Sequence, residues 1–157
     1  MSILSTSVLG ILREQHEMFR EAIAGLSQEA LNWRPGADTN SAAMLITHAT
    51  ESEGRILRIA IEGELRDPDE LVATRLKSFD AVVDSPDGLV ALIDSADAEA
   101  ARVLAKLDDI DAGTPRTMRG STGAAAWWVF RVIAHNGEHV GNLLLTRQLW
   151  EAQAASG

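Results

Sequence analysis

The chain has 157 residues, of which 46% are hydrophobic and 24% charged, a composition that is typical of a globular protein and argues against disorder. Its formal net charge is −9 and it contains no basic run, so we expect no nucleic-acid partner. Cysteine is absent, which excludes disulfides, a cysteine nucleophile and thiolate ligands and leaves His, Asp and Glu for any metal site.

The first predicted helix covers about residues 5–26, because apolar residues recur there at helical spacing. They are Val8, Leu12, Phe19, Ile23 and Leu26. His16 falls on the same stripe, where it would pack in the core, line a pocket or supply a fourth metal ligand. Pro35 and Gly36 then interrupt the helical pattern, and Thr39, Asn40 and Ser41 are candidate N-caps for the next helix.

The second predicted helix covers about residues 41–62 and carries a polar interruption in its inward stripe. The stripe consists of Leu45, His48, Ser52, Ile56 and Ile59, with Glu51 close to the same face. Gly63 is a candidate C-cap. A short helix is expected after Asp67 and Pro68, and we assign no function to it.

The third long helix begins at Ser85 and Pro86, a strong start signal, and has an apolar face that continues to Leu107. Residues 108–123 are rich in Gly, Thr, Asp and Pro and predict a long loop with turns. The last helix covers residues 124–150, without proline and with apolar residues at helical spacing.

Four long helices with little strand signal predict an all-α helical bundle, in which each apolar stripe is covered by the others. The two long connections permit crossovers, so the periodicity leaves the order of helix directions open. The length fits a single domain over residues 1–157. Without a secretory signal or an apolar stretch of bilayer length, we expect a cytoplasmic protein with no membrane contact.

Two histidines of the last helix, His135 and His139, are four residues apart and therefore leave the same face. With His48 on the inward stripe of another helix, they could hold a divalent metal in the bundle core. Neutral imidazole suits zinc above all, and also nickel or iron, and three ligands leave positions open for water or substrate. The alternative is that these are ordinary core or surface histidines.

Glu51 lies three residues after His48 and is the candidate catalytic group. It could hydrogen-bond a ligand imidazole or accept a proton from a bound nucleophile. The alternative for Glu51 is a solvated helix carboxylate. Position 136 is Asn, so the HExxH pattern of metalloproteases is absent together with its general base.

Three motifs in order carry a family resemblance: LNWRP at residues 31–35, HATESE at residues 48–53 and HNGEHVG at residues 135–141. Through them nearly the full chain resembles the DinB-like superfamily of bacterial four-helix bundles. The resemblance implies an up-down-down-up bundle, a divalent metal held by His48, His135 and His139, and a homodimer. Characterised relatives include transferases and isomerases that use mycothiol or bacillithiol, among them a mycothiol-dependent maleylpyruvate isomerase.

Three functional hypotheses follow. The first is a metal-dependent transferase or isomerase, in which the metal lowers the pKa of a low-molecular-weight thiol and presents it to a small-molecule electrophile. The second is a metal-dependent hydrolase that activates water. The third is a non-catalytic, stress-associated bundle in which a metal has a structural role.

Overall fold

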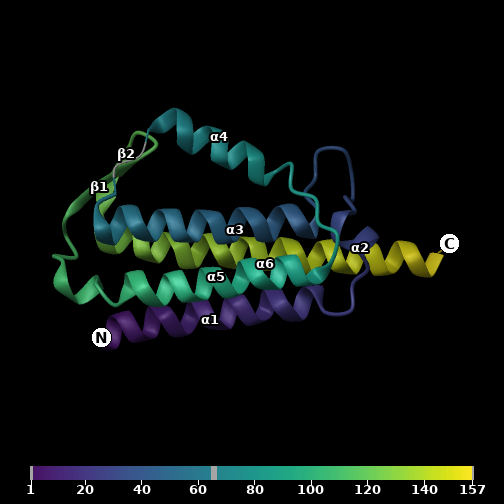
Figure 1. The fold of residues 1–157 in the computed structure, drawn as a ribbon, viewed down its shortest axis with the longest axis horizontal. Coiled ribbons are helices and arrows are strands. Elements are labelled where there is room, and N and C mark those ends of the chain that lie inside the picture. Colours follow the sequence, from purple (N-terminus) through teal and green to yellow (C-terminus); the bar gives the residue numbers. More distant parts are fainter. Residues whose placement is uncertain (1, 65–66, 157) are drawn as a thin grey trace.

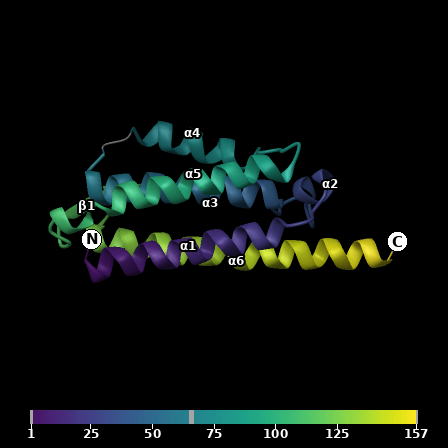
Figure 2. The ribbon, with the colours of Figure 1, turned by 60° about the horizontal axis from the view of Figure 1, so that its bottom comes forward.

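The structure is a computed structural model and describes residues 2–64 and 67–156. Its centre is a bundle of four long helices (Figure 1): α1 (Ile3–Ile23), α3 (Ala42–Leu57), α5 (Pro86–Leu104) and α6 (Ala125–Ser156). In chain order these helices run up, down, down and up, so α1 is parallel to α6 and α3 is parallel to α5 (Figures 1 and 2). The all-α fold and the helix order implied by the resemblance are confirmed.

Each long helix packs on two others, because α1 and α3 both contact α5 and α6. Apolar side chains fill the bundle in two clusters, one toward each end. The first includes Leu12, Leu57, Leu104 and Val132; the second includes Phe19, Leu45, Ile93 and Leu143. Between the clusters lies a polar layer to which every long helix contributes one residue. This layer consists of His16, Glu53, Asp97 and Asn136.

The helix ends follow local sequence signals. The Ser41 hydroxyl accepts a hydrogen bond from the Met44 amide, which confirms its predicted role as the N-cap of α3. The chain then continues through one π-helical turn, η1 (Arg58–Glu62), and stops at Gly63, which adopts the left-handed conformation with a φ of +68°. Pro86 occupies the first turn of α5, as predicted.

The connections contain more structure than the sequence predicts. They hold the short helix α2 (Gln28–Asn32), the crossing helix α4 (Pro68–Ser78) and a 3₁₀ turn, η2 (Leu107–Asp109). The predicted loop over residues 108–123 contains an antiparallel hairpin, β1 (Pro115–Met118) and β2 (Ser121–Ala124). Strands of four residues are too short to show a clear alternation of apolar and polar positions, which explains why the hairpin is missed.

Helix α4 runs along the outer side of α3 and returns the chain to the end where α5 begins (Figure 1). The last helix, α6, continues to Ser156 rather than ending near Trp150. Among the helices of residues 2–64 and 67–156, none combines the length and the apolar character that crossing a membrane requires.

Candidate metal centre

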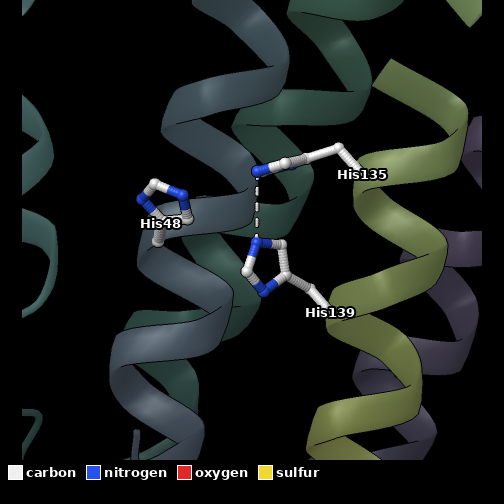
Figure 3. A group of neighbouring side chains, drawn as sticks. All are labelled: His48, His135 and His139. Atoms are coloured by element: carbon white, nitrogen blue, oxygen red, sulfur yellow. Dashed lines mark hydrogen bonds between the residues drawn. The ribbon is translucent and has the colours of Figure 1, made fainter. Parts of the chain in front are cut away.

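Three histidines from two helices converge at one point of the bundle (Figure 3). His48 projects from α3 toward His135 and His139 of α6, and its ring centroid lies 5.3 Å and 5.1 Å from theirs. The Nε2 atoms of His135 and His139 are 3.2 Å apart. One ligand nitrogen from each of the three rings lies within 4.8 Å of the other two. The spacing of four residues therefore has the expected result, two imidazoles on one face directed at a common partner.

The orientation of His48 is fixed by the end of α4. The Ser78 hydroxyl donates to the Arg75 carbonyl oxygen at 2.7 Å, so toward His48 it acts as an acceptor and receives the Nδ1 hydrogen at 3.0 Å. This bond leaves the lone pair of the His48 ring on Nε2. The ring also stacks on Phe79, with centroids 4.5 Å apart and planes at 26°. Ser78 and Phe79 thus lock both the tautomer and the plane of a candidate ligand.

All three histidines are held in the neutral form that metals bind. Burial, with a contribution from His139 and His135, lowers the pKa of His48 to about 3. Burial and the neighbouring His139 lower the pKa of His135 to about 4, and burial also lowers the pKa of His139. At neutral pH a divalent cation would displace no proton from these rings. The donor set of three imidazole nitrogens fits zinc, nickel or iron.

A cavity of about 480 Å³ opens beside the histidines. Its apolar wall comes from Ile56, Phe79, Met118, Trp127 and Trp128. Its charged lining consists of Arg55, Arg75, Arg119, Arg131 and Glu138. The size and the mixture of apolar wall and few polar groups are typical of a small-molecule site.

The chain matches the DinB superfamily over residues 11–143. It belongs to the DinB superfamily. Among solved structures, the crystal structure of the DinB-like protein YjoA from Bacillus subtilis is similar, with a TM-score of 0.69 and 15% sequence identity over 90% of each chain. At this identity the likeness shows a shared fold and nothing of the activity. A search of curated proteins finds no match.

Glu51 of this DinB-superfamily chain lies away from the histidine cavity, which corrects the expected placement. The residue as a whole is exposed, and it lines a separate cavity between α3, α4 and α5, together with Arg58 and Glu99, where its carboxyl group is partly buried. Burial raises the pKa of Glu51, against the opposing effect of Arg55. A helix turns by about 100° per residue, so Glu51 lies about 60° to one side of His48 and Ser52 about 40° to the other side. Glu51 therefore faces a different neighbour from the one that His48 and Ser52 face. The role of Glu51 as a proton acceptor stays an untested prediction.

His16 packs in the polar layer of the bundle and does not line the histidine cavity. Its Nε2 lies 2.9 Å from Oε2 of Glu53, and the Asn136 side-chain amide donates to the same oxygen. His16 and Glu53 are at most 1% exposed. Of the alternatives for His16, the packed core histidine is the one that the structure supports. Glu53 and Asn136 belong to the motifs quoted above, but a single sequence gave no signal that they meet.

Proposed function

We propose that this DinB-superfamily protein binds one divalent metal ion through His48, His135 and His139, with zinc favoured and nickel or iron as alternatives. Three features support the proposal: the convergent ring nitrogens, the neutral state that burial imposes, and the Ser78 bond that directs Nε2 of His48 toward the other rings. Of these, the convergence of the three nitrogens within 4.8 Å carries the argument. The described residues around the point of convergence supply three nitrogen ligands, which leaves room for a further ligand from the cavity.

We further propose that the metal-loaded protein is a transferase or isomerase that uses a low-molecular-weight thiol, such as mycothiol or bacillithiol, on a small electrophile. A divalent ion lowers the pKa of a thiol that binds to it, and so supplies the thiolate nucleophile that a chain without cysteine lacks. The support is the cavity of about 480 Å³, which gives the histidines access to a ligand of that size. Phe79 and Trp128 contribute apolar surface to this cavity, and Trp128 is anchored by its Nε1, which donates to the Arg116 carbonyl oxygen at 2.9 Å.

We also propose that the protein forms a homodimer through α1 and α6, which lie side by side along one face of the bundle (Figure 2). Large apolar side chains of both helices are exposed on the isolated chain. They include Leu4, Ile11 and Met18 of α1 and Phe130, Leu144, Leu145 and Leu149 of α6. Light scattering behind a sizing column tests this, since a mass near 16.9 kDa would show a monomer.

The metal proposal is tested by elemental mass spectrometry on tag-free protein purified without a chelator. We expect about one equivalent of metal in the parent and none in His48→Ala or His139→Ala. Glu51→Gln, on the same helix as His48, is the matched control and should keep its metal. No metal in the parent, and no uptake of added zinc or nickel, would overturn the proposal.

The activity is tested next with 1-chloro-2,4-dinitrobenzene as electrophile and with mycothiol and bacillithiol in turn. Turnover that requires both metal and thiol supports the transferase. Turnover of ester or amide substrates without thiol points instead to the hydrolase. A protein that loses thermal stability in His48→Ala but shows no turnover in either assay would be a bundle with a structural metal.

A further inference from the structure

We propose that the histidine cavity binds a small organic anion, and that Arg75 and Arg119 hold its carboxylate at the exposed side of the cavity. This inference names the class of ligand for the proposed function. It rests on the proposed function only for the reaction at the histidines, and the binding of the carboxylate by the arginines does not depend on the metal. The ligand class is a carboxylate with an apolar or aromatic body. Three independent features lead to it: the charge of the cavity, the relation between Arg75 and Arg119, and the backbone of Arg119.

The charge of the cavity is opposite to that of the protein. The chain as a whole has a formal net charge of −9, yet among the residues that the structure describes four arginines and one carboxylate, Glu138, line this cavity. Glu138 is already engaged, because it accepts a hydrogen bond from Arg131 at 3.2 Å. Arg55 is only 6% exposed and donates to the Ser52 hydroxyl at 2.9 Å. An electropositive pocket on an acidic protein concentrates anions from solution.

Arg75 and Arg119 are the two remaining cations, and they come from different connections, α4 and the hairpin turn. Both side chains line the same cavity, and the charge of Arg75 adds to burial in lowering the pKa of Arg119. Arg75 lies over the Phe79 ring, 5.5 Å from its centroid. Among the side chains that the structure describes, no carboxylate forms an ion pair with either guanidinium. An anion placed between them would relieve the repulsion and could accept paired hydrogen bonds from a planar guanidinium.

Arg119 adopts a backbone conformation that its side chain does not favour. Met118 pairs with Ser121, so Arg119 and Gly120 form a two-residue turn in which both φ angles are positive, +51° and +75°. Gly, Asn and Asp are the residues that such turns prefer. An arginine at the first position therefore lowers the stability of the folded protein, and strain of this kind is often found at functional sites. The hairpin places this arginine in the lining of the histidine cavity.

The rest of the lining indicates the body of the ligand. Trp127 is 52% exposed and meets Trp128 edge to face, with centroids 4.6 Å apart. With Phe79 and Met118, these rings form the apolar part of the lining. The Phe79 ring contacts both sides, because it stacks on His48 and lies under Arg75. A ligand that satisfies both parts carries its charge at one end and an apolar or aromatic group next to it.

The test is a titration of zinc-loaded, full-length protein with phenylacetate and with its neutral isostere phenylacetamide, followed by calorimetry and by tryptophan fluorescence. We expect phenylacetate to bind at least about tenfold more tightly than the amide, because a charged acceptor forms the stronger hydrogen bonds. Arg75→Gln and Arg119→Gln should each weaken phenylacetate binding by about tenfold. Arg75→Lys and Arg119→Lys keep the charge and should bind more tightly than the Gln variants. Arg20→Gln, which removes an arginine of α1 that pairs with Asp94, is the control and should bind like the parent.

The same titration of metal-free His139→Ala protein separates this inference from the metal proposal. A preference for phenylacetate over the amide that persists without metal, and that falls in the arginine variants, supports the anion site even if the parent binds no zinc. Equal binding of acid and amide would overturn the inference. It would also fail if phenylacetate binding requires the metal and is unchanged by Arg75→Gln and Arg119→Gln, because the carboxylate would then bind the metal and not the arginines.

Discussion

The hydroxyl of Ser78 receives the Nδ1 hydrogen of His48 at 3.0 Å, across the contact between α4 and α3. Ser78 in turn donates to the Arg75 carbonyl oxygen, so the direction of both hydrogen bonds is set. The crossing helix α4 thus determines which nitrogen of His48 is available to a metal. Partners of this kind typically change metal affinity by about 10- to 100-fold.

Ser78→Ala should therefore weaken zinc binding by about tenfold or more while leaving the bundle folded. Ser78→Thr keeps the hydroxyl and should retain most of the affinity. Competition with a chromogenic chelator measures the dissociation constant, and circular dichroism verifies the helix content. An unchanged dissociation constant in Ser78→Ala would show that the bond does not orient the ligand.

Glu53→Ala should destabilise the metal-free protein by roughly 3 kcal/mol, since each buried polar group left without a partner costs about 1–3 kcal/mol. The carboxylate accepts from both His16 and Asn136, and without it two buried polar side chains lose their partner. Urea denaturation gives the free energy of unfolding. Glu17→Ala, a change at an exposed position of α1, should alter it by less than about 0.5 kcal/mol. A similarly small effect of Glu53→Ala would contradict the structural role of the polar layer.

Stability should fall in acid partly through Glu62 and Glu99, whose carboxylates accept hydrogen bonds from Arg102. These bonds hold the pKa of both groups at about 2, below the ordinary value of 4.5. Above pH 4.5 the contribution is fully present, and it is lost as the pH falls toward 2, because the unfolded chain takes up protons first. The effect is modest, since water screens exposed pairs.

The measurement for this ion-pair network is Tm from pH 6 to pH 3 for the parent and Arg102→Gln. The parent should be the more stable protein at pH 6, and the difference should shrink below pH 4.5 and at high salt. Arg34→Gln removes an arginine that donates to the backbone carbonyl oxygens of Ala37 and Thr39, and so controls for general charge effects. A difference that grows in acid would refute this assignment.

Arg119→Gly should raise the free energy of unfolding by up to about 1 kcal/mol, since glycine adopts a φ of +51° without the steric penalty of a side chain. Arg119→Ala removes the same guanidinium but keeps the strained Cβ, so it should show no such gain. Thermal unfolding of both variants tests the difference. If the two variants are equally stable, the turn carries no strain at this residue.

Much of this architecture follows from sequence periodicity and spacing. The stripe of α3 and the four-residue spacing in α6 predict that His48, His135 and His139 face the interior, and the structure brings them together. The order of the helices came from the resemblance, because periodicity gives no information on the direction in which a long connection crosses.

The sequence does not predict the contacts that residues of the connecting segments make with the bundle. Ser78 and Phe79 reach His48 because α4 crosses α3, and no local signal encodes that crossing. Glu51 is close to His48 in sequence but not in its surroundings, because it faces the cavity between α3, α4 and α5. The contact of Glu53 with His16 is likewise a long-range pairing, which one sequence does not reveal.

The histidines and the arginines of the cavity come from different parts of the fold, and this has an evolutionary consequence. The candidate metal ligands lie on α3 and α6, whereas Arg75 and Arg119 lie on a crossing helix and a hairpin turn outside the four-helix core. Connections tolerate substitution and insertion far better than packed helices do. A protein with this bundle could therefore change the ligand that its cavity accepts by replacing two surface segments, while the three histidines on the packed helices stay in place.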